Sequence, residues 1–288
     1  MEQDTRTLPA GKPPPLQGPP QARLSVPDAN HDAPPAYTRQ PSVPTHNPTS
    51  PQQPIDSPYA FLGQFDTIFV IDDSGSMAGR SWRETAAALG AITPICTEQD
   101  TNGIDIYFLN HRNPYANDRL GSYTNVTTTA AVQEIFGTVR PMGGTPTGTR
   151  LNAILKDYLS TLEKSVAKGA ESAVKPLNII VITDGVATDD VESVIVSAAK
   201  KLDKMSAEPW QVGIQFFQVG QEAEAAADLK ELDDLLAGDH GVRDMVDTVP
   251  WSGVDSNVLT ADGIIKVTMG AINRKLDRKK GTDERLRR

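Results

Sequence analysis

The sequence is poor in cysteine, in histidine and in long apolar runs. Its one cysteine, Cys96, excludes an intramolecular disulfide and any cysteine-cluster zinc site. A lone cysteine is typical of a reducing compartment, and we expect Cys96 to fill a buried apolar position. The longest purely aliphatic stretch, Ile179 to Ile182, is far too short to cross a bilayer, and the N-terminus shows no signal pattern. We therefore expect a soluble cytoplasmic protein without a transmembrane segment, with a nuclear location as the alternative.

The chain also lacks a concentrated basic surface. Its formal net charge is −9, and the acidic residues are spread along the sequence rather than gathered in one block. Nucleic-acid-binding domains usually carry a clustered basic patch. We therefore expect no nucleic acid as the main partner. An internal repeat or a coiled-coil heptad run is not found either.

Proline is unevenly distributed, and this divides the chain. Of the 22 prolines, 15 lie at or before Pro58, in a region with few large apolar side chains. Such a composition cannot offset chain entropy by burial, so we predict a disordered, proline-rich arm over residues 1–60 with polyproline character. A folded domain should span residues 61–280, followed by a basic C-terminal tail over residues 281–288.

The folded part alternates short apolar runs with amphipathic ones, which is typical of a parallel sheet with crossover helices. Several of the runs are continuously apolar, as in strands covered on both faces. The segment from His111 to Val126 is ambiguous, and we interpret it as a loop followed by an edge strand. A capping box at Ser81 and Glu84 should start the first helix. We predict strands over 65–71, 104–109, 177–183, 215–219 and 245–249, and helices over 81–95, 149–164, 189–205, 222–236 and 261–278.

Three stretches place oxygen ligands where strands end or a helix begins. The first strand leads into Asp72, Ser74 and Ser76, and the strand at 177–183 leads into Asp184. Between them a glycine-rich loop, residues 143–149, opens a helix. The carboxyl ends of parallel strands share one edge, so these oxygens should meet there. Oxygen ligands suit a hard cation such as Mg²⁺, and neutral hydroxyls leave the ion positive enough to attract an outside carboxylate.

Together these stretches resemble the metal-ion-dependent adhesion site of von Willebrand factor A (vWA) domains. The resemblance rests on the Asp-x-Ser-x-Ser pattern, the Gly-Gly-Thr-x-Thr loop and the strand-Thr-Asp-Gly turn, in the family's order. It covers roughly residues 65–278. It implies a three-layer αβα, doubly wound, mostly parallel sheet with a short antiparallel edge strand, for which residues 122–126 are the candidate. It also implies binding of Mg²⁺ or Mn²⁺ by a site built from Asp72, Ser74, Ser76, Thr145 and Asp184.

Simpler interpretations remain for the neighbouring residues. We expect Asp73 to be a solvated neighbour of the site, and Thr147 and Thr149 to be helix-capping hydroxyls rather than ligands. His111 and His240 are the histidines of the folded part, and neither stands in a triad pattern, so we expect each to be a surface or hydrogen-bonded (satisfied) histidine. The glycine-rich loop has no lysine before Thr149, which argues against a nucleotide-binding loop.

We therefore favour a non-enzymatic module that captures an Asp or Glu of a protein partner. One alternative is a metal-dependent hydrolase or phosphatase on the same acidic rim, with Asp72 as nucleophile. Another is a domain that keeps the fold and leaves the site unused. A melting temperature indifferent to added cation would indicate this second alternative.

The two ends of the chain carry weaker signals. Pro34, Pro35 and Tyr37 form a Pro-Pro-x-Tyr motif, which resembles ligands of WW domains and suggests recruitment by a WW-containing ubiquitin ligase. With this motif the chain would act as an adaptor. Residues 274–288 hold eight basic and three acidic residues. Their simplest interpretation is a solvated helix end, with an acidic membrane or nucleic-acid contact as the alternative.

Overall fold

A six-stranded sheet organises the described part of the chain. The computed structural model describes residues 63–99, 102–170, 173–220, 222–238 and 242–249, together with Gly263. The strands are β1 (Asp66–Ile71), β2 (Ile104–Phe108), β3 (Tyr123–Val126), β4 (Leu177–Thr183), β5 (Val212–Gln218) and β6 (Val246–Val249). They lie in the order β3-β2-β1-β4-β5-β6, and every neighbouring pair is parallel except β2 and β3. The chain thus winds outward in both directions from β1, as in doubly wound sheets.

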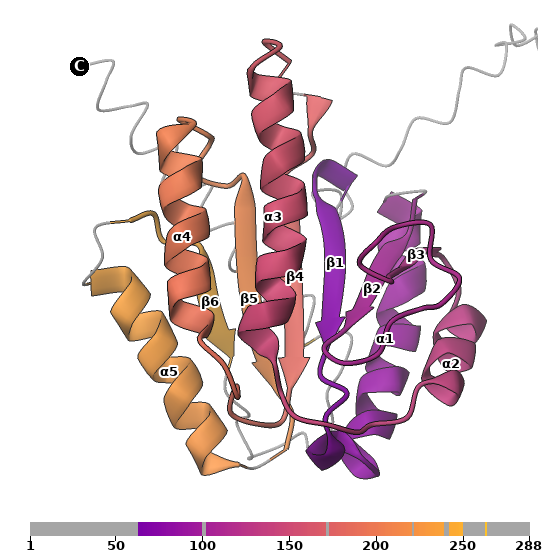
Figure 1. Cartoon of the computed structure of the whole chain (residues 1–288). Helices are drawn as coiled ribbons and strands as arrows, with labels where there is room; N and C mark the ends of the chain where they lie inside the picture. The colour runs from indigo at the N-terminus through magenta and orange to yellow at the C-terminus, as the bar shows by residue number, and fades with distance from the viewer. Residues whose placement is uncertain are drawn as a thin grey trace, which may run out of the picture. The chain divides into compact units, whose positions relative to one another are not determined.

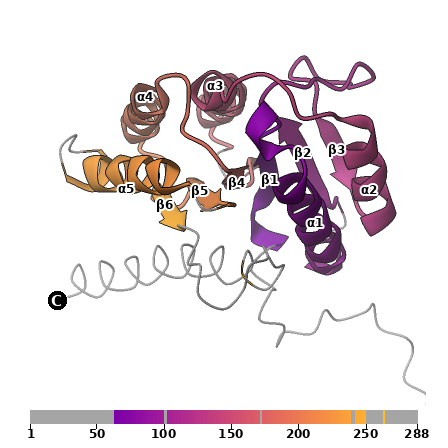
Figure 2. The same cartoon turned by 90° about the horizontal axis from the view of Figure 1, so that it is seen from below.

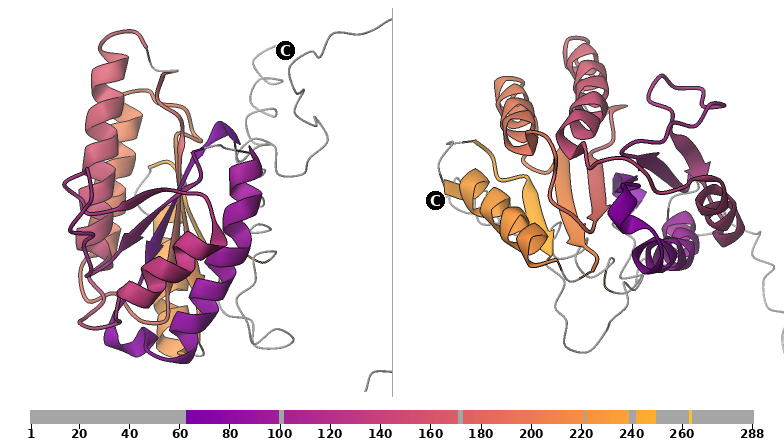
Figure 3. Two further views of the ribbon diagram at one scale, coloured as in Figure 1. Left: turned by 90° about the vertical axis from the view of Figure 1, so that its right-hand side faces the viewer. Right: turned by 60° about the horizontal axis from the view of Figure 1, so that its bottom comes forward.

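Helices cover both faces of this sheet. Figures 1 and 2 show α3, α4 and α5 on one face and α1 and α2 on the other, and Figure 3 shows the sheet edge-on between the layers. The predicted three-layer αβα arrangement is therefore confirmed. Among the described residues, no helix is both long and apolar enough to span a membrane. The helices are α1 (Arg80–Gln99), α2 (Thr129–Thr138), α3 (Thr147–Val166), α4 (Val191–Lys204) and α5 (Ala223–Gly238), with a short 3-10 turn at Gly75–Met77 before α1.

The apolar side chains of the strands contribute to two hydrophobic cores, one on each face of the sheet. Side chains alternate along a strand, so Ile68 and Val70 of β1 pack on the side of α3 and α4. Phe69 and Ile71 pack on the opposite side, with α1 and α2. Because both faces are covered, β4 is buried at all seven positions. Cys96, on α1, is 4% exposed within the second core, which confirms its expected role as an apolar filler.

Most of the predicted elements are present, with shifts at their ends. β3 pairs antiparallel with β2, which confirms the edge strand expected near residues 122–126. Helix α1 begins at Arg80, one residue before the predicted capping box at Ser81, and Glu84 pairs with Arg80 (Nε···Oε1 2.5 Å). The proline-rich arm, the helix expected over 261–278 and the basic tail lie outside the described residues, apart from Gly263.

Helix α2 is an element that the sequence interpretation missed. It has only ten residues, and it buries Val132, Ile135 and Phe136. These three apolar side chains lie at helical spacing on one face of the helix. Thr128 caps its start, since the Thr128 Oγ1 accepts a hydrogen bond from the Ala131 N–H at 3.2 Å. The spacing and the capping threonine together were the local signals for this helix.

Candidate metal centre

The candidate centre begins with Asp72, the residue that follows β1. Asp72 is fully buried, and its Oδ1 accepts a hydrogen bond from the Ser74 N–H at 2.8 Å. Its Oδ2 accepts from the Thr183 hydroxyl at the end of β4, at 2.7 Å. Burial raises the pKa of Asp72, and the hydrogen bonds from Thr183 and Ser74 offset only part of this rise. The carboxylate therefore ties together the ends of two neighbouring strands.

A chain of oxygens runs outward from this carboxylate. The hydroxyls of Ser74 and Ser76 lie 3.0 Å apart, and the Ser76 hydroxyl donates to Asp184 Oδ1 at 2.7 Å. Ser74 and Asp184 are buried, whereas Ser76 is exposed at the rim. Burial raises the pKa of Asp184, and the hydrogen bond from Ser76 acts in the opposite direction. Oxygens from the loops after β1 and β4 thus meet at the carboxyl edge of the sheet.

Thr145 reaches the same place from the loop before α3. A Cβ atom built on Gly185 would lie 3.8 Å from the Thr145 Oγ1 and 3.9 Å from the Ser76 Oγ. Both hydroxyls therefore lie around the backbone of Gly185. The Thr145 carbonyl accepts from the Thr188 N–H at 2.9 Å, which joins its loop to the turn after β4. The structure thus brings together all five residues of the predicted metal set.

The family model of the von Willebrand factor type A domain matches residues 66–250, well over half of the chain. The chain belongs to the von Willebrand factor type A domain family. Members of this family are generally protein-interaction or adhesion modules, and they often depend on a metal ion.

Solved structures similar to this chain include two proteins of low sequence identity. The manganese-loaded TRAP protein of Plasmodium vivax has 13% sequence identity and a TM-score of 0.34, over 66% of this chain and 70% of that one. The SpRpn10 VWA domain has 12% identity and a TM-score of 0.38, over 69% of this chain and 93% of that one. A comparison with curated proteins finds no match.

Asp73 of this vWA domain is not the solvated neighbour that the sequence suggested. It is 1% exposed, and its Oδ1 accepts from the Asn110 N–H at 2.7 Å. Its Oδ2 accepts from the His111 N–H at 2.8 Å. The carboxylate is buried because the backbone after β2 provides the donors that water would otherwise supply. Asp73 therefore anchors the β2 loop against the centre.

Asn110 is a residue of the site region that the sequence interpretation missed. Its Nδ2 donates to Asp73 Oδ1 at 3.2 Å and to the Gly144 carbonyl at 2.9 Å. Gly143 has a φ of +90°, and a Cβ there would come within 3.2 Å of the Asn110 Oδ1. One amide thus joins the β2 loop to the glycine-rich loop. Its signal in the sequence was its position, since Asn110 follows a predicted strand at the same edge as Asp72.

The predicted capping role of Thr147 and Thr149 is wrong. Helix α3 starts at Thr147, has Pro146 as its N-cap and has no side-chain cap of its own. The donors at its start are satisfied from another loop, because Asp189 accepts from the Gly148 N–H at 2.7 Å and from the Thr149 N–H at 2.6 Å. Asp189, in the turn after β4, therefore caps the N-terminus of α3.

His111, the histidine among the described residues, interacts with Tyr123. His111 Nε2 lies 2.9 Å from the Tyr123 hydroxyl, and the two rings stack. Burial lowers the pKa of His111. His240 lies outside the described residues, as do Pro34, Pro35 and Tyr37 of the WW-binding motif. The expectation of a satisfied histidine is confirmed for His111.

Proposed function

We propose that this vWA domain is a divalent-cation-dependent protein-binding module. Ser74, Ser76 and Thr145 would hold Mg²⁺ or Mn²⁺ directly, while Asp72 and Asp184 would act through water. The observation that carries the proposal is the continuous row of oxygens from Ser74 through Ser76 to Asp184, with separations of 3.0 and 2.7 Å. The bound ion would supply an open coordination position for a carboxylate of the partner.

The donor set fits the chemistry of a small hard cation. Magnesium binds oxygen at about 2.0–2.1 Å in an octahedron, so adjacent ligand oxygens lie about 3 Å apart. The Ser74 and Ser76 hydroxyls have this separation at 3.0 Å. The Ser76 O–H donates a hydrogen bond to Asp184, so the Ser74 hydroxyl is the donor to Ser76, and one lone pair of the Ser76 oxygen is left for an ion. The residues present therefore fit the ion that we propose.

The charge of the centre favours capture of an acidic group. Among the described residues, no three Asp, Glu, His or Cys side chains cluster as metal ligands. The centre instead has two carboxylates, and both oxygens of Asp72 already accept hydrogen bonds from Ser74 and Thr183. Neutral hydroxyls would leave the ion with much of its positive charge. An Asp or Glu from a partner would then complete the coordination shell.

The surface around the centre supports a protein as the partner. Two of the exposed large apolar side chains flank the site, Met142 at 69% and Val186 at 36% exposed. The Met142 N–H donates to the Asp73 carbonyl at 2.7 Å, and Val186 follows Asp184 by two residues. Protein interfaces are enriched in methionine and have an apolar core, so an exposed Met142 beside the site favours a protein partner.

A hydrolytic role has less support, and we propose that the chain is not an enzyme. Asp72, the residue that would act as nucleophile, is fully buried, and both of its oxygens are occupied by hydrogen bonds. We further propose a cytoplasmic adaptor in which the Pro-Pro-x-Tyr motif at Pro34, Pro35 and Tyr37 docks a WW-domain protein. This part of the proposal rests on the sequence motif.

Titration of the full chain with Mg²⁺ and Mn²⁺ tests the proposal through the melting temperature. At a cation concentration tenfold above Kd, binding should add roughly 1.4 kcal/mol and raise the Tm by about 3–6 °C. Ser74→Ala should remove this rise, because it deletes a ligand and leaves the buried backbone unchanged. Thr149→Ala is the matched control, since Thr149 is an exposed threonine on the same rim and should respond as the unmodified chain does. A Tm indifferent to both cations, or partner capture that is equal in EDTA, would contradict the proposal.

A further inference from the structure

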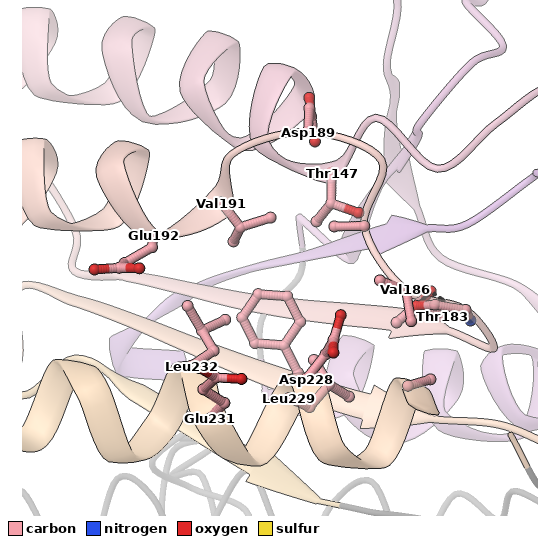
Figure 4. A pocket seen from close by; sticks show the side chains of 14 residues that line it. Thr147, Thr183, Val186, Asp189, Val191, Glu192, Asp228, Leu229, Glu231 and Leu232 are labelled. Carbon is pink, nitrogen blue, oxygen red and sulfur yellow. Dashed lines mark hydrogen bonds between the residues drawn. The ribbon is translucent and has the colours of Figure 1, made fainter. Parts of the chain in front are cut away.

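A hollow beside the candidate centre lies between α4, α5 and the turn that joins β4 to α4. We call it the α4–α5 groove. Val186, Asp189 and Glu192 line it on one side, and Asp228 and Glu231 line it from α5 (Figure 4). Its volume is about 250 Å³. Pockets that enclose drug-sized ligands or cofactors have roughly 300–1,000 Å³. The size therefore favours a single side chain of a partner over a cofactor.

The lining of the groove combines an apolar floor with an acidic border. The floor contains Val191, Phe216 and Leu229, which are at most 8% exposed. Asp228 and Glu231 are exposed on α5 at the border, and the described lining residues include no lysine, arginine or histidine. An aliphatic stem with a cationic head matches both features, because lysine and arginine bury their methylenes and keep their charge at the border.

The groove is continuous with the candidate centre. A second hollow, lined by Ser76 and Asp184 among others, shares Gly185, Val186 and Ala225 with the groove. Gly185 also lies against the hydroxyls of Ser76 and Thr145. The second hollow adds Glu222 and Glu224 and again no basic side chain among the described lining residues. A partner segment that reaches the centre would thus extend directly onto an acidic, partly apolar surface.

We propose that the α4–α5 groove binds a lysine or arginine of the same partner segment whose carboxylate is captured at the centre. The inference rests on the proposed function and narrows its partner to a segment with an acidic residue and, within a few positions, a basic one. The centre selects the acidic residue. The groove selects the basic residue through Asp228 and Glu231, and it fixes the direction in which the segment lies.

Selection of displayed random peptides on the full chain in Mg²⁺ tests this inference. The selected peptides should share one Asp or Glu and, a few residues away, one Lys or Arg. For a synthetic copy of the strongest peptide, replacing its basic residue by alanine should weaken binding about two- to fivefold, the usual worth of an exposed charge pair. Glu231→Gln should weaken the original peptide by a similar factor. It should leave the alanine peptide unaffected, because the two changes remove the same interaction.

Glu134→Gln is the matched control. Glu134 is an exposed glutamate on α2, at the opposite face of the sheet, and its substitution should leave peptide binding unchanged. The inference would be overturned, with Mg²⁺ dependence intact, if the selected peptides carried no basic residue. It would also be overturned if the Glu231→Gln and Asp228→Asn variants each bound the peptide as tightly as the unmodified chain does. Peptide binding that persists in EDTA but is still weakened by Glu231→Gln would contradict cation-dependent capture at the centre and support binding in the α4–α5 groove. Binding that appears only after deletion of residues 281–288 would assign the groove to the chain's own basic tail and overturn the partner.

Discussion

Helices α2 and α3 begin in different ways, although both start in threonine-containing turns. Helix α2 is capped by the residue before it, since the Thr128 hydroxyl accepts from the Ala131 N–H. Helix α3 has no such cap, and Asp189, 41 residues later than Gly148, accepts from its first N–H groups. The start of α2 is therefore a local structure. The start of α3 takes its side-chain acceptor from the turn after β4.

This difference matters because α3 begins at the candidate centre. Thr145 lies two residues before α3, and Asp189 lies five residues after Asp184. One carboxylate thus joins two of the three loops that supply the proposed ligands. Backbone contact adds to this, since a Cβ on Gly148 would lie 2.4 Å from the Asp190 carbonyl oxygen. The loops of the centre consequently hold each other in position, and we expect them to be disturbed together.

The largest expected effect comes from filling this backbone contact. Gly148→Ala should lower the free energy of unfolding by about 2–3 kcal/mol. The added methyl would overlap the backbone carbonyl of Asp190, which cannot move aside as the end of a flexible side chain could. Gly137→Ala makes the same change in α2, where nothing lies within 4 Å, and should instead stabilise by about 0.5 kcal/mol through helix propensity. Urea unfolding of both variants measures the contrast. Two shifts of the same sign would show that α3 starts no differently from α2.

A smaller effect should follow from removing the distant cap. Asp189→Ala should cost about 1–2 kcal/mol of unfolding free energy, because two N–H groups at a helix start lose their acceptor and the helix dipole loses a nearby charge. It should also reduce the rise in Tm on adding Mg²⁺, since the loops of Thr145 and Asp184 lose their link. Denaturant unfolding and the cation titration provide the two measurements.

Asp190→Ala separates the two consequences. Asp190 caps its own helix, α4, by accepting from the Ser193 N–H at 2.9 Å. Hydrogen bonds from Ser193 lower the pKa of Asp190, so its contribution to stability is present at neutral pH and is lost as the pH falls through that lowered pKa. This variant should lose some stability and keep the full Mg²⁺ response. An equal loss of the response in both variants would refute the specific link through Asp189.

The comparison also explains which features could be predicted from sequence. Strand β4 contains the unbroken apolar run Ile179 to Ile182, so the existence of the strand and its two covered faces follow from the residues alone. Asp72 and Asp184 follow predicted parallel strands, and the rule that such strands end at one edge brings them together. These inferences need only local patterns and one general rule of topology.

The features that escaped prediction depend on donors and acceptors far apart in the chain. Asp73 is buried because the backbone N–H groups of Asn110 and His111 reach it, 37 and 38 residues later. The cap of α3 is supplied in the same way by Asp189. A threonine near a helix start caps the helix only if no acceptor from a distant part of the chain binds the first N–H groups instead. Sequence spacing alone does not show whether such an acceptor is present.

The smallest expected effects on stability come from replacing the threonine at each helix start, Thr128 for α2 and Thr149 for α3. These two substitutions compare the two helix starts most directly. Thr128→Ala should cost about 0.5–1 kcal/mol, because the Ala131 N–H loses the side chain that caps α2. Thr149→Ala should change stability by no more than about 0.5 kcal/mol, since Thr149 is exposed and its N–H is already bound by Asp189. Unfolding of the two variants in urea measures this contrast. A loss at Thr149 as large as that at Thr128 would mean that α3 is capped by its own hydroxyl, and the dependence of the centre on the turn after β4 would lose its basis.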